Sequence, residues 1–174
     1  MANMGFYQEL NSILTLTCSS LLENQNLCKL VYYYPTQTNY QFNPLSQPDI
    51  EDTSILLMKN IFPLPKIPDA DTEQNCFINV TITRGTPIAS NPRFRSVILS
   101  FDVICHLDCW IIKGGVRPLS IIHEIDSMFN FQETKMDILN KPIATDLIPR
   151  GYSNKFYGYQ LTYELQVNNN IKCG

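Results

Sequence analysis

Three segments of the chain alternate apolar and polar residues, and this pattern constrains the fold more than any other feature of the sequence. In residues 97–111 the apolar side chains fall on one face, and residues 76–82 and 155–168 alternate in the same way. Successive side chains of a strand point to opposite sides of a sheet, so each segment is expected to be a half-buried strand. The first two segments follow one another closely, which predicts an antiparallel hairpin.

Two further segments carry apolar residues at helical spacing. Residues 6–23 and residues 118–130 each predict an amphipathic helix, and Pro118 suits the first turn of the second one. Residues 27–34, which Pro35 ends, indicate a strand or the end of a helix that leads into one. The expected fold class is therefore α+β, a mainly antiparallel sheet packed against two α-helices.

The length of 174 residues predicts a single domain that spans residues 1–174. Within it, residues 36–74 change composition to Pro, Asn, Gln, Asp and Ser, which disfavours regular helices and strands. Excursions this long inside a compact domain are usually functional. We therefore expect the proline-rich excursion 36–74 to be a contact arm toward another subunit or partner.

Composition limits the classes of function. Charged residues make up 17% of the chain, below the share of about 25% that is typical of soluble domains, which predicts that partners cover part of the surface. A net charge of -3 without a basic block argues against direct DNA binding. The sequence has neither a long apolar run nor a signal-peptide pattern, so we expect a soluble protein, made in a cytoplasm, with reduced cysteines.

The clusters of chemistry-bearing residues predict no metal, cofactor or catalytic site. Cys105 and Cys109 flank His106, but in a strand they would lie about 13 Å apart, too far for one tetrahedral zinc ion. Asp102, His106 and Asp108 would share a polar face, which leaves open a less favoured role in acid–base chemistry. Gly114 is not part of a phosphate-binding loop, because the lysine and serine of such loops are missing.

Two apolar groups are candidates for contact with other subunits. One interrupts the outward, mostly polar face of the predicted hairpin, and tryptophan is a frequent anchor of interfaces. The other would be a costly exposure on the excursion of a monomer. The hairpin group is Phe77, Ile98, Ile104 and Trp110, and the excursion group is Ile55, Leu56, Leu57, Met58, Ile61 and Phe62.

Several stretches, in order along the chain, resemble the tail terminator and head–tail joining (neck) proteins of long-tailed bacteriophages. They are LCKLVYYYP at 27–35, NPLSQPDI at 43–50, KNIFPLPKIPD at 59–69, SFDVICHLDCW at 100–110 and GVRPLSIIHEIDSMFN at 115–130. The order of helix, strands, helix and strand expected from periodicity agrees with the terminator fold.

The resemblance implies a virion structural protein that is not an enzyme and has no catalytic residues. Such a protein forms a homo-oligomeric ring, commonly of six subunits, on the tail tube protein and meets the neck or head-completion proteins. It is assembled in the host cytoplasm and located at the neck or the top of the tail. The excursion is longer than a minimal terminator needs, so another neck or portal-side ring, including one of a short-tailed phage, stays open. A small enzyme that uses the strand around His106, and then a nucleic-acid-binding module, are the weaker alternatives.

Overall fold

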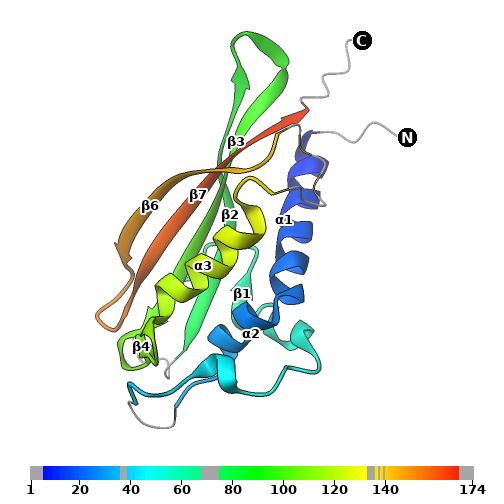
Figure 1. The fold of residues 1–174 in the computed structure, drawn as a ribbon. Coiled ribbons are helices and arrows are strands. Elements are labelled where there is room, and N and C mark those ends of the chain that lie inside the picture. The colour runs from blue at the N-terminus through cyan, green and yellow to red at the C-terminus, as the bar shows by residue number, and fades with distance from the viewer. Residues whose placement is uncertain are drawn as a thin grey trace.

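A five-stranded sheet is the centre of the fold (Figure 1). The computed structural model describes residues 6–35, 39–67, 75–132, 136, 138 and 140–168. The strand order is β1-β2-β3-β7-β6, with β1 parallel to β2 and every other pair antiparallel. The strands are β1 Ile61–Phe62, β2 Cys76–Ile88, β3 Asn91–His106, β6 Ile143–Gly151 and β7 Phe156–Asn168. The predicted antiparallel hairpin, β2 with β3, is confirmed.

Helices cover one face of this sheet (Figure 1). They are α1 Phe6–Glu23, α2 Gln25–Tyr32 and α3 Arg117–Phe129. Both predicted helices and the α+β class are confirmed. Of the two alternatives expected for residues 27–34, a strand or the end of a helix, the structure has the helix. The Asn24 side chain accepts a hydrogen bond from the Leu27 N–H and caps α2, and the backbone is extended only from Tyr33.

The main core lies between the helices and the sheet. Strand alternation places Ile78, Phe101 and Leu165 on the helix side, where each is fully buried. The Phe101 ring lies 5.3 Å from the Phe129 ring of α3 and 5.8 Å from the Tyr163 ring of β7. This packing fixes α3 over the middle of the sheet.

A second apolar cluster lies on the opposite face of the sheet. It joins Phe62, Phe77, Ile104 and Phe156, with the Phe77 ring 5.9 Å from the rings of both Phe62 and Phe156. The expectation that Phe77 and Ile104 form an outward patch is wrong, since they are 3% and 0% exposed. The reason is the chain after β1, which crosses this face: the Asn79 amide donates to the Lys66 carbonyl at 2.7 Å, and the Lys66 ammonium lies 4.4 Å from the centre of the Phe62 ring.

The expected strand 97–111 ends early, at His106. Its imidazole Nδ1 accepts a hydrogen bond from the Asp108 N–H, which starts a 3-10 turn at Leu107–Cys109. The short strands β4 Ile111–Ile112 and β5 Gly115–Val116 follow as a separate ribbon. The prediction that Trp110 shares a strand face with Phe77 and Ile104 is therefore wrong.

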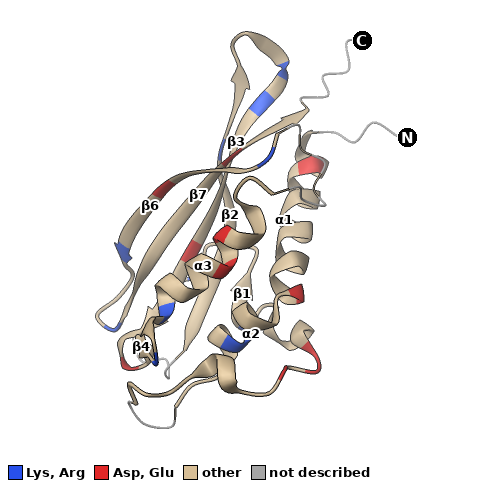
Figure 2. Ribbon diagram, viewed as in Figure 1, with Lys and Arg blue, Asp and Glu red and all other residues tan. Residues whose placement is uncertain are grey.

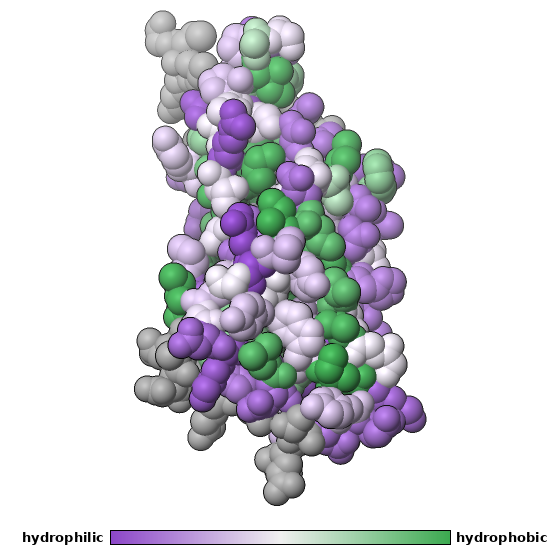
Figure 3. Space-filling model, turned by 90° about the vertical axis from the view of Figure 1, so that its left-hand side faces the viewer, coloured by the Kyte–Doolittle hydropathy of each residue, from purple (hydrophilic) through white to green (hydrophobic). Residues whose placement is uncertain are grey.

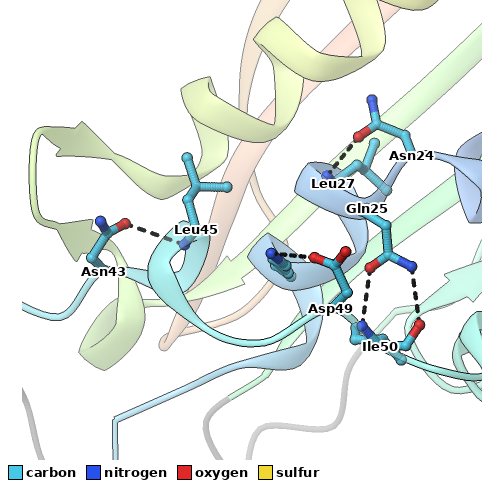
Figure 4. Close-up of polar contacts among 8 residues, drawn as sticks. Asn24, Gln25, Leu27, Asn43, Leu45, Asp49 and Ile50 are labelled. Atoms are coloured by element: carbon cyan, nitrogen blue, oxygen red, sulfur yellow. Dashed lines mark hydrogen bonds and ion pairs between the residues drawn. The ribbon is translucent and has the colours of Figure 1, made fainter.

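The described part of the proline-rich excursion, residues 39–67, is held against α2. The Gln25 amide makes two hydrogen bonds of 3.0 Å to the backbone of Ile50, and the Lys29 ammonium lies 2.6 Å from an Asp49 carboxylate oxygen (Figure 4). The excursion forms the 3-10 turns Pro44–Ser46 and Thr53–Leu56 and then β1. Residues 36–38 and 68–74 lie outside the described residues.

The excursion also contributes to the cores, which its composition did not indicate. Ile50, Leu56, Ile61 and Phe62 are all at most 7% exposed. Apolar residues that lie between prolines and turns can thus be buried in a core although their spacing follows neither a helix nor a strand. In the described part of the chain, no helix is both long and apolar enough to cross a membrane.

Candidate interaction surface

Exposed apolar side chains gather at the two opposite edges of the sheet. At the β6 edge, Ile143, Leu147 and Ile148 are 44%, 47% and 37% exposed. Figure 3 looks onto this side and shows hydrophobic residues in a nearly continuous column down it. At the β1 edge the exposed apolar residues are Ile55, Leu57, Met58, Leu64 and Ile67. Further exposed apolar residues outside these two groups include Tyr7, Tyr40 and Phe131.

A pocket of about 480 Å³ opens beside the β6 edge. We call it the aromatic pocket, and its lining residues are Leu107, Trp110, Pro149, Arg150, Gly151, Tyr157, Gly158 and Tyr159. The Trp110 and Tyr159 rings lie 6.4 Å apart, and Tyr157 is 40% exposed. Aromatic side chains that combine an apolar ring with a polar group, such as those of tyrosine and tryptophan, are enriched at protein interfaces.

The pocket lies beside the first residues of β7, away from the contact between β7 and the end of α3. The Phe129 ring of α3 packs 6.3 Å from Tyr163, whereas Tyr157 and Tyr159, further back on the same strand, lie beyond that contact. The turn after β3 forms the other wall, since the Leu107 N–H donates to the Lys155 carbonyl at 2.9 Å. Residues of β7 and of the turn after β3 therefore form two walls of the pocket.

The β1 edge carries a projecting turn that we call the apolar knob, made of Ile55, Leu57 and Met58. Their exposed fractions are 44%, 43% and 55%, while Leu56 between them is fully buried. Met58 has φ of 61°, a left-handed conformation that is uncommon for a residue other than glycine. The Met58 N–H donates to the Ile61 carbonyl at 2.8 Å, which holds this conformation. The knob thus has a defined backbone conformation and exposes its three apolar side chains.

Buried polar groups anchor the knob to the rest of the molecule. The Asn60 side-chain amide lies 2.9 Å from the Val31 carbonyl, 2.8 Å from Asn75 Oδ1 and 2.9 Å from the Cys76 carbonyl. The Tyr34 hydroxyl also contacts the Val31 carbonyl, and it accepts a hydrogen bond of 2.9 Å from the Cys76 N–H. Asn60 is 1% exposed, so these contacts replace water that it would otherwise bind.

A fully buried arginine connects the two sides of the molecule. Arg117 Nε donates to the Cys109 carbonyl at 2.7 Å, next to the aromatic pocket. Its Nη1 donates to the Leu30 carbonyl at 2.6 Å and the Tyr33 carbonyl at 3.0 Å, at the end of α2. A positive group there satisfies helix-end carbonyls that have no intrahelical partner. Arg117 was not selected from the sequence, where nothing distinguishes it from a surface arginine.

Opposite charges accompany the two features (Figure 2). Arg150 lines the aromatic pocket, and Lys155 contributes its carbonyl to the pocket wall. Before the knob come three exposed acidic residues, Asp49, Glu51 and Asp52, of which Asp49 pairs with Lys29. The nearby residues of opposite sign are Asp108 beside the pocket, 3.5 Å from His106 Nδ1, and Lys59 after the knob, 5.5 Å from the centre of the Tyr32 ring.

The polar groups around His106 are not presented to solvent together. His106 is 4% exposed, and its ring packs 5.0 Å from Phe156. Asp102 accepts hydrogen bonds from the Tyr152 hydroxyl at 3.1 Å and the Gln160 amide at 2.9 Å. The predicted common face of Asp102, His106 and Asp108 is wrong, because Asp108 belongs to the 3-10 turn.

The described cysteines are free and buried. Contrary to the strand geometry, Cys109 turns toward β2, and its sulfur lies 3.6 Å from that of Cys76. Burial raises the pKa of the Cys18 and Cys28 thiols to about 11 and that of Cys76 well above its usual value. Such thiols stay protonated at neutral pH and are weak nucleophiles. Within the described residues, no three His, Cys, Asp or Glu side chains form a group that could hold a metal ion.

The structure separates the candidate interface residues into accessible and inaccessible ones. Accessible or half-buried are Ile55, Leu57, Met58, Ile98 and Trp110, whereas Phe77, Ile104, Leu56, Ile61 and Phe62 are buried in the subunit. Sequence reasoning missed Leu147 and the role of β6 altogether. The tyrosines at 157 and 159 had a signal, an aromatic stripe, which predicts core or subunit packing but not a pocket.

Comparison with known proteins gives a single kind of match. The family model described as YomW matches residues 24–165, which is most of the chain. No curated protein and no solved structure matches significantly.

Proposed function

The chain belongs to the YomW family, and on that premise we propose that it is a virion structural protein of the phage head-to-tail connection. The family bears the name of a Bacillus phage-derived protein. The sequence resemblance to tail terminators supports the more specific proposal, a subunit of a ring that caps the tail tube and joins it to the neck. Its partners are then further copies of itself, the tail tube protein and neck or head-completion proteins.

The observation that carries the proposal is the pair of apolar features at opposite edges of one sheet. The aromatic pocket and the apolar knob differ in shape and in the sign of the neighbouring charges. A subunit with two different contact patches associates head to tail, and head-to-tail contacts generate rings when the rotation closes. A dimer with two-fold symmetry would instead need one self-complementary patch.

An enzymatic function draws less support from the geometry. His106 faces its own backbone and Phe156, and Asp102 is engaged by Tyr152 and Gln160. A general base must come within hydrogen-bond distance of the proton that it removes from a substrate. Neither side chain is placed for that contact.

The oligomeric state of the purified full chain tests the proposal. Light scattering coupled to size exclusion, together with negative-stain images, should give closed rings of one size. Mass spectrometry of purified virions should find the chain, at a copy number equal to that of one ring. A compact monomer at all concentrations that is also absent from virions would contradict the proposed function.

A further inference from the structure

We infer that the ring is closed by insertion of the apolar knob of one subunit, Ile55, Leu57 and Met58, into the aromatic pocket of a second copy of the chain. The inference rests on the proposed ring function and adds the contact that builds it. It assigns the two exposed apolar features to each other rather than to two unrelated partners.

The two features have the positions that a head-to-tail contact requires. The knob is joined to β1 through the Met58 N–H and the Ile61 carbonyl, and the pocket borders β6, at the other end of the strand order. The segments that carry them, residues 53–58 before β1 on one side and the turn between β6 and β7 on the other, both lie toward the lower end of the ribbon in Figure 1. Neighbouring copies can therefore bring a knob beside a pocket without one subunit being turned over.

The two features also match in chemistry. The knob offers flexible aliphatic and thioether side chains, and Met fills irregular apolar spaces well. The pocket offers the rings of Trp110, Tyr157 and Tyr159. Its volume of about 480 Å³ lies in the range of ligand-binding clefts, and the pocket is open to solvent, so a side chain of a neighbouring subunit can enter it.

The charged residues beside the two features favour contact of a knob with a pocket, which is a head-to-tail contact. The acidic residues before the knob, Glu51 and Asp52, would face Arg150 and Lys155 beside the pocket, whereas two knobs or two pockets would bring like charges together. Arg150 donates to Gln160 at 2.9 Å in the subunit and has further N–H groups for a carboxylate. Asp108 beside the pocket and Lys59 after the knob have the opposite signs, but each is outnumbered at its own feature. The majority charges thus favour unlike patches over like ones.

The β6 backbone is poorly suited to the alternative contact, addition of a neighbouring strand. The register shifts between Ala144 and Asp146, and Pro149 lacks a backbone donor. Bulges and prolines protect sheet edges from pairing with other chains. We therefore expect the contact at this edge to be made by side chains.

Two single variants, each defective in one patch, test the inference. Met58→Asp places a charge on the knob, and Tyr157→Asp places one in the pocket. Each change should raise the dissociation constant for self-association by about 30-fold or more, because a central interface residue is lost. Tyr7→Asp, at an 80% exposed position on α1, is the matched control and should assemble as the wild type does.

Mixing the two variants gives the decisive result. Each alone should be monomeric, but the mixture should form 1:1 dimers, since one intact knob and one intact pocket remain. Trp110 is the single tryptophan of the chain, so its emission should shift to shorter wavelength in the mixture and not in either variant alone. Circular dichroism and thermal unfolding of each variant establish that the subunits are folded.

The outcomes separate the inference from the proposed function. Rings formed by both variants, or two folded monomeric variants that do not combine, would overturn the knob-and-pocket contact while wild-type rings still support the function. A wild type that stays monomeric would overturn the proposed function and the contact together.

Discussion

The two edges of the sheet are protected in different ways. At the β1 edge the terminal strand is two residues long, and Ile61 and Phe62 are 0% and 2% exposed because the chain folds over them. At the β6 edge the nine-residue strand has mostly exposed side chains, and its protection is a bulge and Pro149. Burial removes the strand of the first edge from contact and leaves the knob, Leu64 and Ile67 exposed there. The second edge keeps its side chains available to a partner.

The largest effect is expected from Gly158→Ala, which would detach the β6 edge from the sheet. A Cβ at Gly158 would lie 1.7 Å from the Val103 carbonyl oxygen, a backbone atom that cannot move without breaking the β3–β7 pairing. We expect a loss of at least about 3 kcal/mol in the free energy of unfolding, measured with urea. Gly115→Ala is the control, because nothing lies within 4 Å of its Cβ. Equal stabilities of the two variants would contradict the close approach.

Arg117→Met should have the next largest effect, since Arg117 ties the pocket side to the α2 side. The carbonyls of Leu30, Tyr33 and Cys109 would lose their partner inside the protein. Unsatisfied buried acceptors predict a loss of about 2–4 kcal/mol, measured by chemical unfolding. The exposed Arg93→Met should change stability by less than about 0.5 kcal/mol. An Arg117→Met protein as stable as the wild type would show that the arginine does not hold the two sides together.

Asn60→Leu tests whether the hydrogen bonds of the Asn60 side chain hold the β1 edge of the sheet in place. The variant loses the amide contacts to the Val31 and Cys76 carbonyls, and we expect a loss of about 2 kcal/mol. Hydrogen exchange should accelerate at the Ile78 amide, which donates to the Asn60 carbonyl at 2.7 Å, before it does so in β7. Asn26→Leu, at an exposed site, serves as control. Uniform acceleration over the whole sheet would mean that this edge does not open on its own.

The sequence predicted the elements whose burial follows their periodicity. These are α1, α3, β7 and the β2–β3 hairpin, all of which bury one face against the main core. β6 was missed because a bulge breaks its alternation and nearly every side chain is exposed, so no apolar face marks it. The turn at Leu107–Cys109 was missed because a histidine cap, not a glycine or proline, ends the strand.

The sequence pointed to some residues of the candidate surface and missed others, because exposure of a side chain does not always follow a local pattern. The sequence marked the apolar group of the excursion as a costly exposure, and Ile55, Leu57 and Met58 are the members of that group that are exposed. It could not separate them from the buried Leu56 and Phe62, because that difference depends on where the chain crosses the sheet. The pocket joins residues far apart in sequence, a proximity that no local pattern contains.

The smallest effect on the folded subunit is expected from Leu147→Asp on β6. Leu147 is 47% exposed, so the change should alter the free energy of unfolding by less than about 0.5 kcal/mol in dilute, monomeric protein. The same change at Leu56, which is fully buried at the β1 edge, should cost several times more. Thermal unfolding of the two variants compares the edges directly. A large loss from Leu147→Asp would mean that β6 packs within the subunit more closely than its exposure indicates.

A ring of this kind requires each subunit to meet the next through unlike edges, and an electron-microscopy reconstruction of the assembled protein shows directly which edges are in contact. The expected map is a closed ring with cyclic symmetry in which the β1 edge of each subunit faces the β6 edge of its neighbour. A two-fold dimer joined through identical edges, or a ring whose contacts leave both the knob and the aromatic pocket exposed, would contradict it.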